Sequence, residues 1–123
     1  EQAGGDMLYS SGTTGRPKGV FVPPQETAID APGPMTDILT KLYGVTDQTR
    51  YLSPAPLYHA APLRYTMAVQ RLGGTVVVME HFDAERYLQL VQQHRITATF
   101  LVPTMVYVLL DSPARREAAT VEP

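Results

Sequence analysis

Short apolar runs alternate with helix-like patterns along most of the chain. The four apolar runs are typical of strands and span residues 7–10, 51–55, 75–79 and 98–102. The four helix-like patterns place apolar residues three or four positions apart and span residues 35–43, 62–72, 84–94 and 104–110. Because strands that alternate with helices are typical of parallel sheets with crossover helices, the sequence predicts an α/β fold. The run TVVVM at 75–79 is apolar on both faces, as a strand covered by helices on each side should be, so it is the likeliest buried strand.

Residues at the ends of these patterns support the helix boundaries. Asp83 precedes the helix at 84–94, and its carboxylate can accept hydrogen bonds from the free N–H groups of the first turn. Pro62 suits a first turn because it has no N–H group to leave unpaired. Gly44 and Gly73 follow helix patterns and can adopt the left-handed conformation that ends a helix. The helices should therefore begin and end close to these residues.

Two segments carry neither pattern. Residues 23–34 contain four prolines among polar residues, which predicts an irregular surface loop. Residues 112–123 are polar and have little apolar surface to bury, which predicts a frayed tail. We therefore expect one domain segment at residues 1–111, followed by this tail.

Composition narrows the class of protein. With 123 residues, 44% of them hydrophobic, the chain can bury a core, and one globular unit is expected. Ten basic and twelve acidic residues give a formal net charge of −2, which offers no reason to expect nucleic acid or an anionic membrane as a partner. The absence of cysteine excludes disulfides and cysteine nucleophiles and fits a cytoplasmic protein. No apolar stretch approaches the ~20 residues that a membrane-spanning helix needs.

The stretch 9–20, YSSGTTGRPKGV, combines glycines, hydroxyl side chains and a lysine. Gly12 and Gly15 can adopt positive φ, which turns successive N–H groups toward one anion site. The hydroxyl residues between Ser10 and Thr14 add donors, and Lys18 adds a positive charge. The composition therefore predicts a loop that binds a polyphosphate.

Two alternatives compete with this interpretation. A P-loop NTPase requires glycine before the lysine and serine or threonine after it, whereas Lys18 lies between Pro17 and Gly19, so that class is disfavoured. Glycine, serine and threonine also dominate flexible linkers. A linker has no need of Pro17, Lys18 or the apolar run before the loop, so the phosphate loop is favoured.

The same stretch resembles the phosphate-binding signature of the adenylate-forming superfamily, which includes acyl-CoA synthetases, luciferases and the adenylation domains of peptide synthetases. The residues that match the signature are Ser11, Gly12, Thr13, Thr14, Gly15, Pro17, Lys18 and Gly19. A second match at 56–59, PLYH, resembles the superfamily's Pro-x-aromatic-His element. Residues 6–110 look most like bacterial fatty-acyl-CoA synthetases, so the chain looks like part of their N-terminal domain.

The resemblance implies an ATP-dependent acid-thiol ligase. A carboxylate would attack the α-phosphorus of ATP to give an acyl-adenylate and pyrophosphate, and coenzyme A would then displace AMP. Mg²⁺ would arrive with ATP. The implied contacts of the triphosphate are Ser11, Gly12, Thr13, Thr14, Gly15 and Lys18. Lys18 and His59 are the implied catalytic residues, with His59 orienting a phosphate oxygen or shaping the acyl channel; without the resemblance, a histidine that caps a strand end explains His59 equally well.

Several motifs of the superfamily do not occur in the sequence. They are the Thr-Glu motif with the magnesium-binding glutamate, the Thr-Gly-Asp motif with the ribose-binding aspartate, and the catalytic lysine of a C-terminal domain. We therefore expect a fragment of a longer parent protein, and we expect it to be inactive alone. The fragment would expose faces that the rest of the parent covers, so we expect the fragment to self-associate.

Two other functions stay open. An adenylation domain that activates an amino or aryl acid shares the phosphate loop, and a non-catalytic α/β module could retain only vestigial phosphate binding. The run PLYHAAP at 56–62 favours the acyl-CoA branch. His81 and His94 are expected to be structural, and with His59 they show no metal-ligand spacing, so no protein-bound metal is expected.

Overall fold

A computed structural model describes residues 4–24 and 26–118 and divides the chain into two compact units, Glu1–Gly33 and Pro34–Pro123. The prediction of one globular unit is therefore wrong. The reason is the distribution of apolar burial, because every member of the two hydrophobic clusters comes from residue 35 or beyond. We describe each unit by itself.

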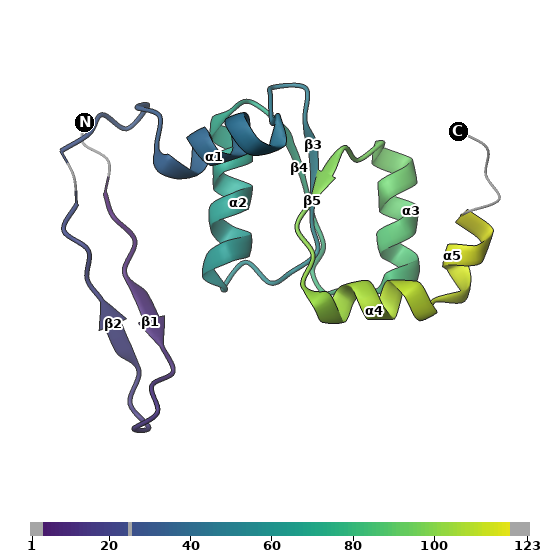
Figure 1. Ribbon diagram of the computed structural model, residues 1–123, viewed down its shortest axis with the longest axis horizontal. Helices are drawn as coiled ribbons and strands as arrows, with labels where there is room; N and C mark the ends of the chain where they lie inside the picture. The colour runs from purple at the N-terminus through teal and green to yellow at the C-terminus, as the bar shows by residue number, and fades with distance from the viewer. Residues whose placement is uncertain (1–3, 25, 119–123) are drawn as a thin grey trace. The chain divides into compact units, whose positions relative to one another are not determined.

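The first unit contains a two-stranded antiparallel hairpin (Figure 1). Strand β1 is Leu8–Ser10 and strand β2 is Lys18–Val20, with Leu8 opposite Val20 and Ser10 opposite Lys18. The predicted strand at 7–10 is confirmed. Strand β2 was not predicted, because a proline before it and a glycine within it hide the alternation that identifies a strand. In the proline-rich segment, the described residues 23–24 and 26–33 form no helix and no strand of the two sheets, and Pro34 already belongs to the next helix.

The second unit is built on a three-stranded parallel sheet (Figure 1). Strand β3, Arg50–Ser53, lies in the centre, with β4, Thr75–Val78, on one side and β5, Ala98–Thr99, on the other. Both pairings are parallel. The α/β fold with crossover helices is therefore confirmed.

Helices cover both faces of this sheet. One cluster joins helices α1, Pro34–Tyr43, and α2, Ala60–Arg71, to Tyr51 of the sheet. The other joins helices α3, Ala84–His94, and α4, Pro103–Asp111, to Leu52. Successive side chains of a strand point to opposite faces, so neighbouring residues of β3 belong to different cores.

The most buried strand is β3 and not β4. Leu52 and Ser53 have no exposed surface, whereas Thr75 and Val78 at the ends of β4 are exposed. Helices cover both faces of β4 as predicted, since Val76 packs against one cluster and Val77 against the other. The strand is nevertheless less buried than β3, because it lies at the edge of the sheet and Val78 at its end is 49% exposed. Strand β5 is also shorter than predicted, since regular pairing ends at Thr99.

The helix boundaries agree closely with the sequence. Asp83 is the N-cap of α3, and its Oδ1 accepts a hydrogen bond of 2.7 Å from the Arg86 N–H. Gly44 and Gly73 have φ of 63° and 85°, the left-handed values expected after a helix. Pro62 lies in the first turn of α2, as predicted.

The structure differs from the sequence prediction after Asp111. Residues Pro113–Ala118 form helix α5, which packs against α3 and α4, where the sequence predicts a frayed tail. A proline at the first helical position, followed by alanine and arginine, favours this short helix. The last five residues lie outside the described part of the chain. Among the helices that the structure describes, none is long and apolar enough to cross a membrane.

Candidate functional site

In the connection between β1 and β2, the backbone at Gly12 has a conformation that only glycine can adopt. Gly12 and Gly15 have φ of 63° and 82°, the positive values predicted for a phosphate loop. A Cβ atom on Gly12 would lie 2.6 Å from the Arg16 carbonyl oxygen, which is a steric clash. Gly12 therefore lets the two sides of the loop approach each other at its base.

Hydroxyl groups and a lysine surround this backbone. Ser11, Thr13, Thr14 and Lys18 are all exposed. Within residues 4–24 and 26–118, none of these four side chains has a hydrogen bond or an ion pair. Lys18 lies at the first position of β2, opposite Ser10, although the sequence places it within the loop. The loop thus presents free donors and one free ammonium group to a ligand.

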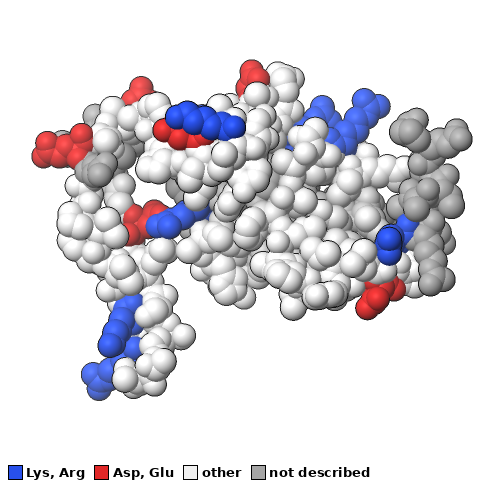
Figure 2. All heavy atoms as spheres, in the orientation of Figure 1, with Lys and Arg blue, Asp and Glu red and all other residues white. Residues whose placement is uncertain are grey.

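The electrostatic character of the hairpin is uniformly positive. Between residues 7 and 24 the only charged side chains are Arg16 and Lys18. Figure 2 shows blue atoms, and no red ones, over the loop end of the hairpin. An anion that binds there meets two cations and no carboxylate of the same hairpin.

His59 lies in the second unit, at the start of α2. It is the N-cap residue, with φ −86° and ψ 144°, but its side chain makes no capping hydrogen bond. Its N–H donates to the Pro56 carbonyl oxygen at 3.2 Å, which forms the turn that the sequence predicts after β3. The imidazole is exposed and lies beside the Tyr58 ring, with 4.5 Å between ring centroids. The structure therefore places His59 at a helix start and leaves its ring free to meet a ligand.

The other two histidines lie at opposite ends of α3. His81 is in the turn between β4 and α3, and His94 is the last residue of the helix. The His94 carbonyl oxygen accepts a hydrogen bond of 3.1 Å from the Arg50 guanidinium. In the described part of the chain, no three histidine, aspartate or glutamate residues form a group that could hold a metal ion.

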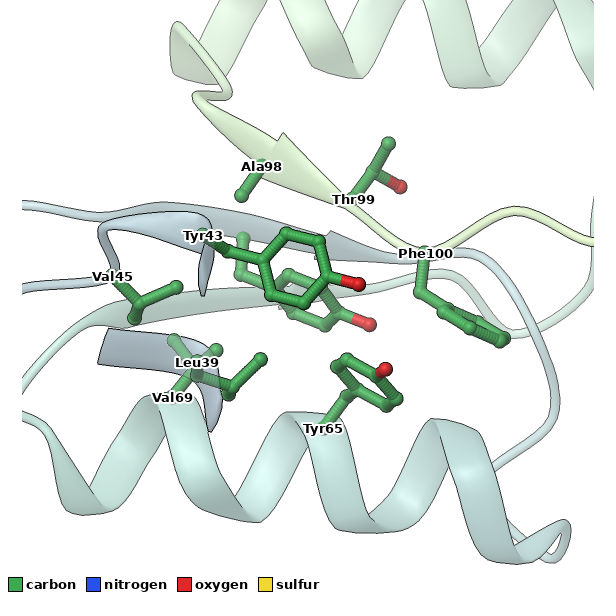
Figure 3. A pocket seen from close by; sticks show the side chains of 9 residues that line it. Leu39, Tyr43, Val45, Tyr65, Val69, Ala98, Thr99 and Phe100 are labelled. Atoms are coloured by element: carbon green, nitrogen blue, oxygen red, sulfur yellow. The ribbon is translucent and has the colours of Figure 1, made fainter. Parts of the chain in front are cut away.

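The second unit also contains an aromatic pocket of about 150 Å³ between the sheet and helices α1 and α2 (Figure 3). It is lined by Leu39, Tyr43, Val45, Tyr51, Tyr65, Val69, Ala98, Thr99 and Phe100. The Tyr65 and Phe100 rings stack, with centroids 4.8 Å apart and an interplanar angle of 26°. The pocket is therefore suited to apolar or aromatic groups.

Tyr51 is the unusual residue of this pocket. The side chain is only 3% exposed, and its hydroxyl has no hydrogen-bond partner among the described residues. Burial, followed by repulsion from Tyr65 and Tyr87, raises the pKa of the Tyr51 phenol above its ordinary value of 10.0. The sequence could not identify the unpartnered Tyr51 hydroxyl, because an aromatic residue in a buried strand is ordinary. Its lack of a hydrogen-bond partner depends on residues far along the chain.

The chain thus combines a glycine loop that carries free hydroxyl groups with an α/β unit built on a parallel sheet. The chain belongs to the family of AMP-binding enzymes, whose family model matches residues 7–122.

Relatives of known activity are several times longer than this chain. The medium/long-chain-fatty-acid–CoA ligase FadD8 of Mycobacterium tuberculosis is 39% identical over 107 residues, which are 87% of this chain and 18% of the relative. The feruloyl-CoA synthase of an Amycolatopsis species is 36% identical over 113 residues, which are 91% of this chain and 22% of the relative. The chain thus spans about a fifth of the length of these relatives.

Solved structures agree with this assignment. ATP-bound MatB from Rhodopseudomonas palustris matches with a TM-score of 0.68 and 29% identity, over 88% of this chain and 20% of that chain. The O-succinylbenzoate coenzyme A synthetase MenE from Bacillus subtilis, in complex with ATP and magnesium, matches with a TM-score of 0.64 and 29% identity, over 86% of this chain and 21% of that chain. The α/β arrangement is therefore that of a segment of adenylate-forming enzymes.

The unpartnered Tyr51 hydroxyl predicts a distinct pH dependence of stability for Tyr51→Phe. Near neutral pH the variant keeps the ring and removes a desolvated hydroxyl, so its free energy of unfolding should equal that of the wild type or exceed it by about 1 kcal/mol. Above pH 10 the unfolded chain releases the Tyr51 proton, while the folded chain retains it because the pKa is raised. Wild-type stability should therefore fall by up to about 1.4 kcal/mol per pH unit, and the variant should lack this contribution.

Urea unfolding at about pH 8 and about pH 11 measures the effect. Tyr107→Phe is the control, because it removes a phenol that is 68% exposed on α4. If the stability difference between wild type and Tyr51→Phe stays constant between the two pH values, the account of Tyr51 is wrong.

Proposed function

We propose that the chain is part of an ATP-dependent acid-thiol ligase that activates a carboxylate as an acyl-adenylate and transfers the acyl group to coenzyme A. The observation that carries this proposal is the hairpin, where two positive-φ glycines and free hydroxyls lie on the connection and Lys18 follows at the first position of β2. Membership in the family of AMP-binding enzymes supports it. We place the protein in the cytoplasm, which the cysteine-free sequence fits.

The loop contributes positioning and charge neutralisation. In the proposed first step a carboxylate oxygen forms a bond to the α-phosphorus, and the bond from that phosphorus to the bridging oxygen breaks. Pyrophosphate leaves with the electron pair. Lys18 would neutralise charge on the β- and γ-phosphates, while N–H groups at Gly12 and Gly15 and the hydroxyls of Ser11, Thr13 and Thr14 bind their oxygens. Such preorganised donors can lower the barrier without covalent participation of the protein.

Mg²⁺ would be bound largely through ATP itself. It prefers carboxylate and phosphate oxygens. The hairpin carries no carboxylate between residues 7 and 24, and the described residues include no group of three metal-ligating side chains. The residues that the structure describes therefore do not form a magnesium site of their own.

His59 is proposed to orient a phosphate oxygen of the adenylate or to shape the acyl channel. Two observations support this role. The imidazole is exposed at the start of α2, and it is not used to cap the helix.

A fatty acid is the preferred substrate class, and an aryl acid is the second candidate. The identity to the fatty-acid ligase FadD8 and the run PLYHAAP support the first. The similarity to the feruloyl-CoA synthase supports the second, and so does the pocket lined by the aromatic rings of Tyr43, Tyr51, Tyr65 and Phe100. An amino acid, as in peptide-synthetase adenylation domains, remains the third candidate.

Pyrophosphate exchange with ATP tests the ligase proposal. We expect the 123-residue chain alone to show no exchange with any acid, because it lacks the superfamily's ribose and magnesium motifs. The parent protein should exchange with a fatty acid more than with an aryl or amino acid. Lys18→Ala in the parent should reduce exchange by about 100-fold or more, as expected when a preorganised charge contact is lost.

Lys41→Ala is the matched control, since it removes one exposed lysine from α1, far along the chain from the loop. Exchange by the isolated chain above its Lys18→Ala variant would contradict the predicted inactivity. A parent protein that prefers an amino acid would reverse the choice of substrate class, and a parent unaffected by Lys18→Ala would exclude the proposed role of the loop.

Self-association of the isolated chain is a second prediction. Helix α4 is apolar on all sides and has no buried residue, and its Tyr107, Val108 and Leu110 are 68%, 51% and 48% exposed. An apolar helix is normally buried against other parts of a protein. Light scattering at roughly 50 µM should give a mass above that of the monomer. Tyr107→Glu should lower this mass, and Tyr58→Glu, at an exposed tyrosine outside α4, should not; a monomeric wild type would contradict the prediction.

A further inference from the structure

Arg16 is the second cation of the hairpin, and the proposed function does not yet use it. Its side chain is exposed and has no hydrogen bond or ion pair with any residue in 4–24 or 26–118. An exposed arginine is usually either paired with a carboxylate or simply solvated. The hairpin offers no carboxylate for pairing, because no acidic residue occurs between residues 7 and 24.

The backbone fixes where Arg16 lies. Its carbonyl oxygen is the group that excludes a side chain at Gly12, so Arg16 is at the base of the loop, next to one of the two positive-φ glycines. The residue that follows is Pro17, which disfavours helical backbone at Arg16. Arg16 is therefore held at the base of the loop, where its carbonyl oxygen meets Gly12.

The spacing of the two cations favours a shared target. Only Pro17 separates Arg16 from Lys18, which opens β2, so the two cations lie within two positions of each other along the chain. The positive region at the loop end in Figure 2 is the combined surface of these two side chains, since the hairpin has no other charge.

We propose that Arg16 is a positioning residue of the phosphate site, binding the terminal phosphate of a polyphosphate chain while Lys18 neutralises the phosphates behind it. This inference rests on the proposed function of the loop. It adds that the loop distinguishes a chain of several phosphates from a single phosphate. The guanidinium group presents a planar fork of N–H donors that matches two oxygens of one phosphate. Lys18 is a point charge and cannot replace that geometry.

Calorimetric titration of the 123-residue chain tests the proposal with three probes: inorganic tripolyphosphate, ATP and orthophosphate. Arg16→Ala should weaken tripolyphosphate and ATP binding by about three- to tenfold, the range of one charge-assisted contact at an exposed site. Orthophosphate binding should change by less than about twofold, since a single phosphate that binds at Lys18 leaves Arg16 unused. Arg16→Lys should recover only part of the loss.

Lys41→Ala is the control for net charge, because it removes one cation from an exposed helix position in the other unit. Thermal unfolding checks that each variant folds like the wild type. Arg16→Ala binding that equals Lys41→Ala binding for all three probes overturns the proposal, and so does a loss for ATP without a loss for tripolyphosphate.

The same titration separates this inference from the function on which it rests. If Lys18→Ala weakens binding and Arg16→Ala does not, the loop remains a phosphate site and the role of Arg16 is wrong. If the wild-type chain binds neither tripolyphosphate nor ATP, both the role of Arg16 and phosphate binding by the loop are wrong. Equal losses for tripolyphosphate and ATP in Arg16→Ala assign the contact to the phosphate chain and not to the nucleoside.

Discussion

Strand β3 connects the two hydrophobic clusters of the second unit, since Tyr51 faces one and Leu52 faces the other. Its backbone pairs with β4 and β5 in parallel, so one short strand fixes the order of the sheet and the faces that the helices cover. The chain leaves β3 through buried Pro54 and Ala55 and turns at 56–59 into α2. The position of His59 is thus a consequence of how this central strand is buried.

The hairpin of the first unit does not depend on a buried core for its shape. It buries little apolar surface, and its shape depends on the close approach of Gly12 to the Arg16 carbonyl and on two positive-φ glycines. The hydroxyl groups of Ser11, Thr13 and Thr14 have no hydrogen-bond partner among the described residues, and because they are exposed, water or a ligand can bind them. The free side-chain donors, the two cations and the lack of a carboxylate between residues 7 and 24 support the proposed role of the hairpin in binding an anion.

The sequence predicted the features that depend on local chemistry. Helix ends followed from Asp83, Gly44 and Gly73, whose roles require only their neighbours. The glycine loop was recognisable because its residue types are needed for its backbone. The relative burial of the strands was not predicted correctly, since a run of valines looks the same at the centre and at the edge of a sheet, and only the order β4-β3-β5 decides between them. The isolated Tyr51 hydroxyl likewise depends on Tyr65 and Phe100, which arrive from distant elements.

The central claim is that the hairpin loop binds the phosphates of a nucleotide. Backbone amide chemical shifts of the chain, followed by NMR during titration with ATP and Mg²⁺, test it most directly. The account predicts that the largest shifts occur at residues 11–16 and Lys18, and that AMP, which lacks the β- and γ-phosphates, produces much smaller ones. Shifts confined to residues beyond 33, or equal effects of ATP and AMP on the loop, would contradict it.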